Sequence, residues 1–243
     1  MISILAAFQF LTLIPPIIRR PFTSQEMGNS VAFYPLVGLG IGAVIYGADW
    51  GLSQIFQTEI RSALLLLIWV LLTGGLHLDG LLDSLDGLFG GFTAETRLEI
   101  MRDERVGAFG VIGGILALII KFTAISVIPA TSLAWLAVPV FSRLGMSFAL
   151  VVFPYVRQVG LGKQIKDNTN WRHLLLAFLF SALIGWLTTG LTGLGIMSLS
   201  LALSWLTGRY ILKRIPGLTG DNYGAINEIL EIFSILLFVG FGL

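Results

Sequence analysis

The sequence predicts an all-α, polytopic integral membrane protein, a helical bundle of about seven transmembrane helices with a short N-terminal interfacial helix. Of its 243 residues, 56% are hydrophobic and only 12% are charged, whereas soluble domains carry about 25% charged residues. The mean hydropathy is +0.89. Apolar stretches long enough to cross a bilayer recur along the whole chain.

The composition also limits the function. The chain has no cysteine, which excludes disulfides, Cys-ligated zinc and iron–sulfur clusters. The formal net charge is only +1, so no nucleic-acid partner is expected. No repeat or soluble segment interrupts the apolar pattern, so residues 1–243 are expected to form a single membrane-embedded domain whose surroundings are the lipid bilayer. Assembly into a homo-oligomer is compatible with this composition.

The N-terminal segment, Met1–Ile18, is apolar but has no basic residues before its apolar run, so it does not resemble a cleaved signal peptide. Pro15 and Pro16 interrupt it just before Arg19 and Arg20. We therefore expect a short helix lying in the membrane interface rather than a span.

Seven apolar stretches follow, and each is expected to be one span. The predicted fifth and sixth spans are separated by a short glycine-containing segment, which indicates a tight hairpin through Gly193 and Gly195. The seven predicted spans are approximately residues 31–50, 60–77, 108–128, 131–153, 174–192, 195–212 and 225–243.

The basic residues are distributed unequally between the two sides of this arrangement. Alternate connections contain twelve of the fifteen, the opposite connections contain only Arg61, and Lys121 and Arg143 fall inside spans. By the positive-inside rule the basic side is cytoplasmic, which predicts a multi-pass protein of the cell membrane with its N-terminal segment inside. The twelve are Arg19, Arg20, Arg97, Arg102, Arg105, Arg157, Lys163, Lys166, Arg172, Arg209, Lys213 and Arg214.

Three aspartates follow the second predicted span, at Asp79, Asp83 and Asp86. Spacings of four and three residues place them on one face of a helix. Three carboxylates on one stripe repel each other, and oxygen-only ligands favour Mg²⁺ or Mn²⁺, so we interpret them as metal ligands. The alternative is an acidic helix start stabilised by the helix dipole. His77 lies on another face, where it could act as acid or base, donate a hydrogen bond, or be structural.

A charged segment, residues 99–107, precedes the third predicted span. It could be a solvated helix stabilised by pairs four residues apart. Alternatively, Arg102 and Arg105 could clamp phosphates, since guanidinium suits bidentate binding of oxyanions, and Asp103 could complete a metal site. Spacing alone does not choose between them.

Two cations, Lys121 and Arg143, lie near the middle of predicted spans. A charge inside the membrane is a candidate functional residue, and we favour contact with a substrate phosphate. The alternative is structural pairing with one of the aspartates.

A second acidic motif, at residues 217–228, leads into the last predicted span. Its glycines allow a tight turn and close approach of a ligand to the backbone. Asp221 and Glu228 are seven residues apart and share a helix face, with Glu231 on the same side. We expect Asp221 and Glu228 to contribute to the same site as the three aspartates.

These motifs, in this order, resemble the cobalamin synthase, or adenosylcobinamide-GDP ribazoletransferase, family. The resemblance covers nearly the whole chain, and the patterns HxDGLxDxxDG at 77–87 and TGDxxGA at 219–225 are specific in combination. The matching segments are residues 33–38, 73–81, 83–87, 99–103, 107, 142–143, 160–162, 219–221, 224–225 and 228.

The resemblance implies a single membrane-embedded catalytic domain that performs a late step of adenosylcobalamin synthesis. The substrates would be adenosylcobinamide-GDP and α-ribazole or its 5′-phosphate, GMP would be released, and Mg²⁺ would be the cofactor. The implied metal ligands are Asp79, Asp83, Asp86 and Asp221, all on the predicted cytoplasmic face. The other implied site residues are His77, Arg102, Asp103, Arg105, Lys121, Arg143 and Glu228.

Two classes of membrane protein remain as alternatives. A CDP-alcohol phosphotransferase of lipid synthesis also uses aspartates on a membrane helix with Mg²⁺, but the Ala-Arg element of that class is missing after Asp79 and Gly80. A divalent-cation transporter should carry charges through the bilayer in several spans, whereas these carboxylates gather at one membrane face.

Overall fold

The computed structural model describes residues 1–130 and 132–242. Within these ranges the regular structure is helical, with one isolated parallel bridge between Tyr155 and Leu218, so the all-α prediction is confirmed. In chain order the elements are α1 (Ile2–Leu11), α2 (Ser24–Ser30), the 3₁₀ turn η1 (Val31–Phe33), α3 (Tyr34–Ser53), α4 (Thr58–Leu72), α5 (Leu76–Gly90), α6 (Ala94–Ile100), α7 (Ala108–Val127), α8 (Ala134–Val152), α9 (Leu161–Asp167), α10 (Trp171–Leu212) and α11 (Gly220–Gly240).

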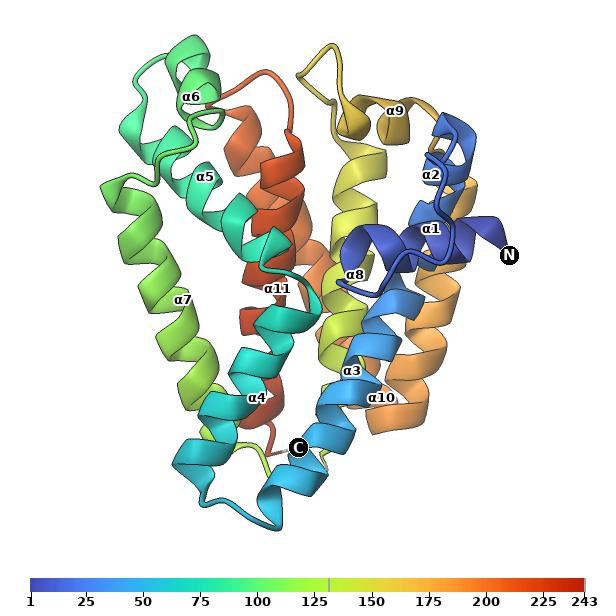
Figure 1. Ribbon diagram of the computed structural model, residues 1–243, viewed down its shortest axis with the longest axis vertical. Coiled ribbons are helices and arrows are strands. Elements are labelled where there is room, and N and C mark those ends of the chain that lie inside the picture. The colour runs from blue at the N-terminus through green and yellow to red at the C-terminus, as the bar shows by residue number, and fades with distance from the viewer. Residues whose placement is uncertain (131, 243) are drawn as a thin grey trace.

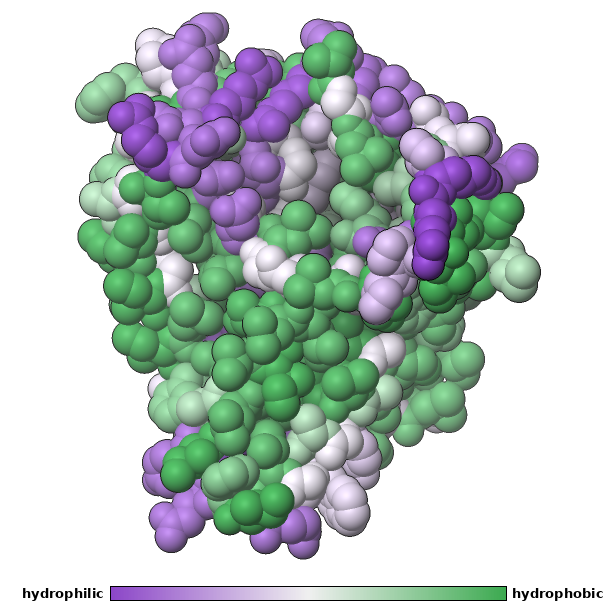
Figure 2. Space-filling view, viewed as in Figure 1, coloured by the Kyte–Doolittle hydropathy of each residue, from purple (hydrophilic) through white to green (hydrophobic). Residues whose placement is uncertain are grey.

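The long helices form a bundle suited to a bilayer. In the described residues five helical stretches are long and apolar enough to span a membrane, or six if the bent pair α4–α5 counts as one span. The predicted count of seven is not confirmed. The outward faces of α7 and α10 expose large apolar side chains, including Ile112, Ile119, Leu183 and Leu187. Hydrophilic residues gather at the two ends of the molecule, with an apolar belt between them (Figure 2). The chain is therefore a multi-pass membrane protein.

Helix α10 is a hairpin rather than one straight rod. At 42 residues it would far exceed a hydrocarbon core of about 30 Å. Thr189 and Gly190 leave the helical conformation, and Gly190 has φ +62°. Its two arms touch, since a Cβ on Gly193 would collide with the carbonyl oxygen of Gly185. The predicted hairpin is present, but the chain reverses at residues 189–190 rather than at Gly193 and Gly195.

Helix α8 is the centre of the bundle and packs against α3, α10 and α11 (Figure 1). Its side chains are almost all buried, including Trp135 and Phe141. Gly38 and Gly42 of α3 lie against the backbone of α8 around Pro139 and Trp135, where any Cβ would collide. Small residues spaced four apart allow this close approach of two membrane helices.

Helices α4 and α5 meet at an angle of 86°. The residues between them include Gly74, at φ +62°, and Gly75, at φ +70°, a conformation that glycine adopts without steric cost. The apolar run predicted over 60–77 therefore does not continue straight into the acidic residues. The bend directs α5 across the bundle toward α11, against which it packs (Figure 1).

The two ends of the bundle differ in charge. We call the end that carries α6, α9 and the connections 154–160 and 213–219 the basic end; it lies at the top of Figure 1. The opposite end carries Arg61, whose Nε lies 3.4 Å from Asp49 Oδ1. Helix α1 is a ten-residue apolar helix, shorter than a span. This charge asymmetry agrees with the distribution of basic residues along the sequence.

Candidate active site

The three aspartates of α5 share one helix face, as predicted, but differ in exposure. Asp79 is exposed, Asp83 is half-buried and Asp86 is buried. Asp83 lies within electrostatic reach of Asp79 and Asp86, and also of Asp221 on α11. The solvent exposure of the acidic face therefore decreases along α5, from exposed Asp79 to buried Asp86.

Asp86 is already engaged by protein donors. Its two carboxylate oxygens accept hydrogen bonds from the backbone N–H groups of Gly107, at 2.7 Å, and Gly110, at 2.8 Å. These are N–H groups at the start of α7 that lack partners within their own helix. Asp86 thus caps α7 and joins it to α5, a structural task that spacing along one helix could not reveal.

The start of α11 is built to bring Asp221 to the acidic face. Thr219 caps the helix by accepting a hydrogen bond from the backbone N–H of Asn222. The Asn222 side chain donates to Ser84 Oγ on α5 at 2.9 Å. Gly80 lies against the backbone of Asp221, where a Cβ would come within 2.8 Å of its carbonyl oxygen. Two segments about 140 residues apart in sequence are thereby held together, as the acidic motifs predicted for Asp221.

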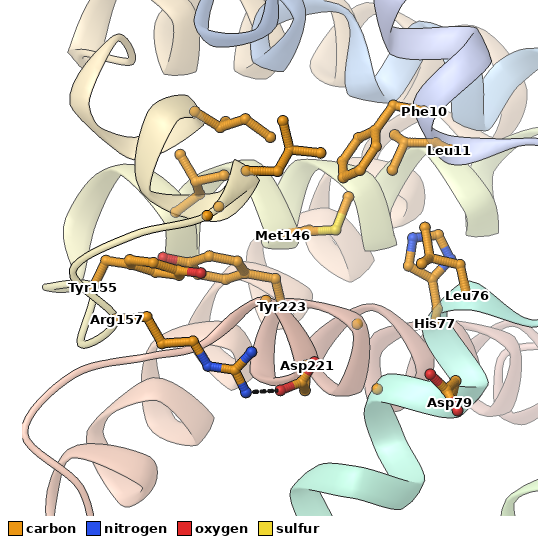
Figure 3. Close-up of a pocket in the computed structure, with 18 of the residues that line it drawn as sticks. Phe10, Leu11, Leu76, His77, Asp79, Met146, Tyr155, Arg157, Asp221 and Tyr223 are labelled. Atoms are coloured by element: carbon orange, nitrogen blue, oxygen red, sulfur yellow. Dashed lines mark hydrogen bonds and ion pairs between the residues drawn. The ribbon is translucent and has the colours of Figure 1, made fainter. Parts of the chain in front are cut away.

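An arginine that the sequence had not singled out completes this group. Arg157, in the connection after α8, donates to Asp221 Oδ2 at 2.7 Å and to the carbonyl oxygen of Met101 at 3.3 Å. Figure 3 shows Arg157 and Asp221 side by side, with Asp79 nearby on α5. The neighbouring family-matching segment 160–162 was the available signal, but nothing in the spacing linked Arg157 to Asp221.

Asp79, Arg157 and Asp221 line a cavity of about 290 Å³ at the basic end. A second hollow, of about 630 Å³, adjoins it and shares Phe10, Leu76 and Asp79. Asp79 therefore stands between an inner cavity and an outer hollow, where it could reach a ligand in either. Helix α1 forms part of both walls, which gives the N-terminal helix a place in the site.

The available oxygen donors suit Mg²⁺ better than a soft metal. In the part of the chain that the structure describes, no group of three or more histidine or acidic side chains is arranged so that it could hold a metal ion. Mg²⁺ does not require such a group, because it keeps several waters and is commonly held by one or two carboxylates together with substrate phosphates. Asp79 and Asp83, with Asp221 beside them, fit that pattern, whereas Asp86 is occupied.

The charged segment 99–107 lies at the same end but does not line the cavity. Asp103 and Arg105 pair with each other at 2.7 Å on the surface, and the Arg105 guanidinium lowers the pKa of Asp103 to about 2. Arg102 is exposed next to them. The structure thus places these three residues on the surface outside the cavity, and their predicted contact with substrate remains a prediction.

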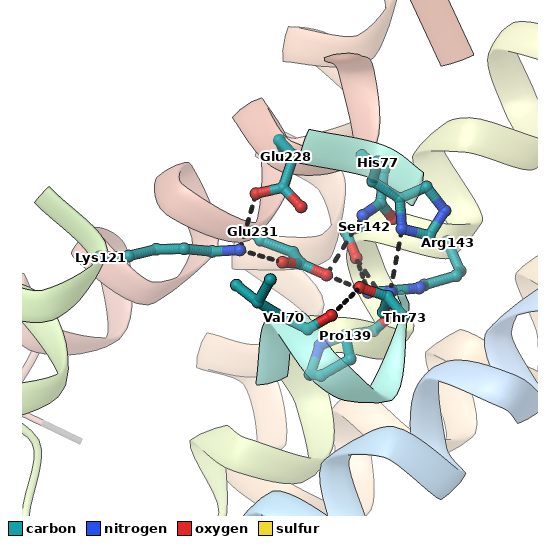
Figure 4. A network of polar contacts seen from close by, with 10 residues as sticks. Val70, Thr73, His77, Lys121, Pro139, Ser142, Arg143, Glu228 and Glu231 are labelled. Atoms are coloured by element: carbon teal, nitrogen blue, oxygen red, sulfur yellow. Dashed lines mark hydrogen bonds and ion pairs between the residues drawn. The ribbon is translucent and has the colours of Figure 1, made fainter. Parts of the chain in front are cut away.

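Lys121, Arg143 and Glu228 are not brought to the acidic face but lie in the bundle interior, joined through Glu231 (Figure 4). Lys121 Nζ donates to Glu228 at 2.8 Å and also to Glu231, and Arg143 donates to Glu231. Lys121 also lies 4.7 Å from the ring centroid of Trp69. Buried charges are stable only when paired, and these four balance one another. The structure therefore does not show the favoured contact of Lys121 and Arg143 with a phosphate. It shows the alternative, structural pairing, but the partners are glutamates rather than aspartates.

His77 connects this interior network to the cavity. Its Nδ1 lies 3.5 Å from the Arg143 guanidinium, and its ring lines the inner cavity. Its Nε2 is buried and has no protein partner. His77 therefore remains a candidate for contact with a ligand.

Comparison with known proteins shows the family of the chain. A sequence model of the cobalamin-5-phosphate synthase family matches residues 3–239. The chain belongs to this family. A relative from Stutzerimonas stutzeri is 39% identical over 239 residues, covering 95% of each chain. One from Desulforamulus reducens is 35% identical over 238 residues, covering 97% of this chain and 95% of its own. Both are named adenosylcobinamide-GDP ribazoletransferase.

Membership of the cobalamin-5-phosphate synthase family makes this protein a transferase of cobalamin biosynthesis. It also decides against the lipid phosphotransferase and the cation transporter, since the match extends over nearly the whole chain. A relative from Pseudomonas entomophila, 39% identical over 229 residues and 93% of each chain, carries the same name. No solved structure matches the chain significantly.

Proposed function

We propose that this protein joins α-ribazole, or its 5′-phosphate, to adenosylcobinamide-GDP and releases GMP in a Mg²⁺-dependent reaction. The observation that carries the proposal is the convergence of Asp79, Asp83 and the Asp221–Arg157 pair where α5 meets α11 beside a cavity. The family supplies the reaction for which this arrangement is suited.

The reaction is a displacement at phosphorus. The 3′ oxygen of the ribose, which is free in α-ribazole and in its 5′-phosphate, forms a bond to the phosphorus nearest the cobinamide. The bond from that phosphorus to the bridging oxygen breaks, and GMP leaves with that oxygen. The 3′-hydroxyl proton passes to a base. Exposed Asp79 lines the cavity and is the candidate for that base. His77 is less suited, because its Nδ1 accepts from Arg143 and its Nε2 then carries the proton.

The charged side chains have separable tasks in this reaction. Asp79 and Asp83 would hold Mg²⁺, which when bound neutralises charge on the pyrophosphate. Asp221 fixes the Arg157 guanidinium, whose remaining N–H groups can bind phosphate oxygens as negative charge develops. Arg102 and Arg105 lie exposed at the same end of the molecule, outside the cavity, where a larger part of the substrate could meet them.

The basic end also sets the proposed orientation. Arg157, Lys163 and Arg214 lie on the side that the positive-inside rule assigns to the cytoplasm. We place the site at the cytoplasmic face of the cell membrane, open to water-soluble nucleotides.

The test is an assay of the purified protein with adenosylcobinamide-GDP, α-ribazole and Mg²⁺, in which cobalamin and GMP are followed by chromatography. We expect equal amounts of both products, none in the presence of EDTA, and recovery when Mg²⁺ is restored. Product formation that EDTA does not affect would contradict the metal requirement. Absence of product from folded protein would contradict the proposed reaction.

A further inference from the structure

The inner cavity is divided into a charged mouth and an apolar interior. Asp79, Asp221 and Arg157 stand at the mouth, near the junction of α5 and α11. Aliphatic and thioether side chains from α8, the following connection and α9 form the opposite wall (Figure 3). Of these, Met146, Leu150 and Ile165 are buried, whereas Val159 and Leu161 are exposed.

Two aromatic rings extend this apolar surface. Tyr155 and Tyr223 are stacked, with ring centroids 6.1 Å apart and planes inclined by 16° (Figure 3). Both line the cavity. Ring faces and aliphatic groups together form a surface that suits a flat, apolar aromatic group.

Four buried polar atoms of residues that line this cavity have no hydrogen-bond partner in the protein: Tyr34 Oη, His77 Nε2, Arg157 Nε and Tyr223 Oη. His77 and Tyr223 are only 2% and 5% exposed. The guanidinium of Arg143 can only donate, so His77 Nδ1 must accept and the proton lies on Nε2. His77 Nε2 and Tyr223 Oη are therefore buried donors without a partner, which is costly.

We infer that this cavity binds the nucleoside substrate with its base against the apolar wall and its ribose toward the charged mouth. The inference rests on the proposed function. At about 290 Å³ the cavity is at the lower limit of small-molecule sites, so it suits a nucleoside, while the corrinoid stays in the adjoining hollow. His77 Nε2 and Tyr223 Oη donate to acceptors of the nucleoside.

The chemistry of the base decides which nucleoside fits. The dimethylbenzimidazole base of α-ribazole is a bicyclic ring with two methyl groups, one free acceptor nitrogen and no N–H donor. Guanine carries N–H donors that need buried acceptors. The carboxylates among the cavity residues, Asp79 and Asp221, stand at the charged mouth, and Asp221 is already paired with Arg157. The apolar wall therefore selects an alkylated benzimidazole over a purine.

The first test separates the two substrates kinetically. Tyr223→Phe keeps the ring and removes only Oη, so we expect the KM for α-ribazole to rise about tenfold, as for one lost buried hydrogen bond. The KM for adenosylcobinamide-GDP should stay unchanged. Tyr46→Phe on α3, outside both hollows, is the matched control and should change neither constant.

The second test varies the base with the wild-type enzyme. Removing each methyl group from the benzimidazole should lower kcat/KM about fourfold, the effect of one buried methylene. An adenine α-nucleoside should react far more slowly still.

A rise in the KM for adenosylcobinamide-GDP alone in Tyr223→Phe would place GDP in the cavity and overturn the inference. So would equal kcat/KM for adenine and benzimidazole nucleosides. If the wild type makes no cobalamin at all, the proposed function fails instead, which is a different result.

Discussion

Asp83 and Asp86 show how two carboxylates less than one helical turn apart can acquire different tasks. Both lie on one face of α5, and the sequence gives no reason to separate them. Asp83 is half-buried and faces Asp79 and Asp221, whereas both oxygens of Asp86 accept backbone N–H groups of α7. The difference arises from α7, which meets only one of the two.

Replacing Asp83 with Asn should abolish turnover while leaving the protein folded. The amide is nearly isosteric, but it removes a negative charge from the proposed Mg²⁺ site. Product formation would be measured at saturating Mg²⁺, and folding by thermal unfolding in detergent. Near-normal turnover would contradict the role assigned to Asp83.

Replacing Asp86 with Ala should act mainly on stability. Loss of a helix cap costs about 1–2 kcal/mol, and two N–H groups at the start of α7 lose their acceptor. The expected result is a lower unfolding temperature with Mg²⁺ affinity little changed, measured as the Mg²⁺ dependence of turnover. A large rise in the Mg²⁺ concentration required, without loss of stability, would instead make Asp86 a metal ligand.

Much of the residue-level site could be anticipated from sequence, because Asp79, Asp83 and Asp221 stand out as acids beside glycines and membrane spans. The residues that these aspartates and their helices contact could not be anticipated. Arg157 pairs with Asp221 across 64 residues, and Asn222 reaches Ser84 across 138. Such contacts depend on which helices become neighbours, and no local pattern encodes that.

At the scale of elements, the turn between α4 and α5 decides where the acidic face points. Hydropathy located α4, and the spacing of the aspartates predicted the helix that is α5. Neither pattern carries a direction, so the 86° bend was outside their reach. The consecutive glycines at 74 and 75 were the visible signal, since both adopt positive φ.

Gly75→Ala should therefore be destabilising through the backbone alone. No atom lies within 4 Å of the added Cβ, so the cost is that of a left-handed conformation, about 1–2 kcal/mol. Gly51→Ala is the matched control, because that site is equally open but has ordinary helical φ. Thermal unfolding should fall for Gly75→Ala and stay level or rise for Gly51→Ala; equal behaviour would refute the role of the turn.

At the scale of the whole molecule, four charges hold the bundle together away from the proposed chemistry. Lys121 on α7 and Arg143 on α8 both donate to Glu231 on α11, and Glu228 balances the remaining charge. From the sequence, each of these four residues could be recognised as a charged group within or beside a predicted span, but not which residues would pair with each other. Their burial is tolerable because the set is neutral and hydrogen-bonded.

Replacing Glu231 with Gln should be the most damaging of these substitutions to stability. It leaves Lys121 paired with Glu228 but removes the carboxylate partner of Arg143, and breaking a buried pair costs about 3–5 kcal/mol. Glu26→Gln, which breaks the surface pair with Arg20, is the matched control and should change little. Unfolding temperature and yield of folded protein in detergent would be compared; similar values for the two variants would show that the interior network does not stabilise the bundle.

Helix α11 contributes to both regions, with Asp221 at the cavity and the two glutamates in the interior. It is also the last helix that the structure describes. A chain that enters the membrane in order of synthesis must therefore hold Lys121 and Arg143 without these glutamates until α11 arrives. Arrival of that helix neutralises both cations and completes the acidic face in a single event. Maturation of the enzyme and its acquisition of activity are thus expected to coincide, with inactive and easily degraded chains before that point.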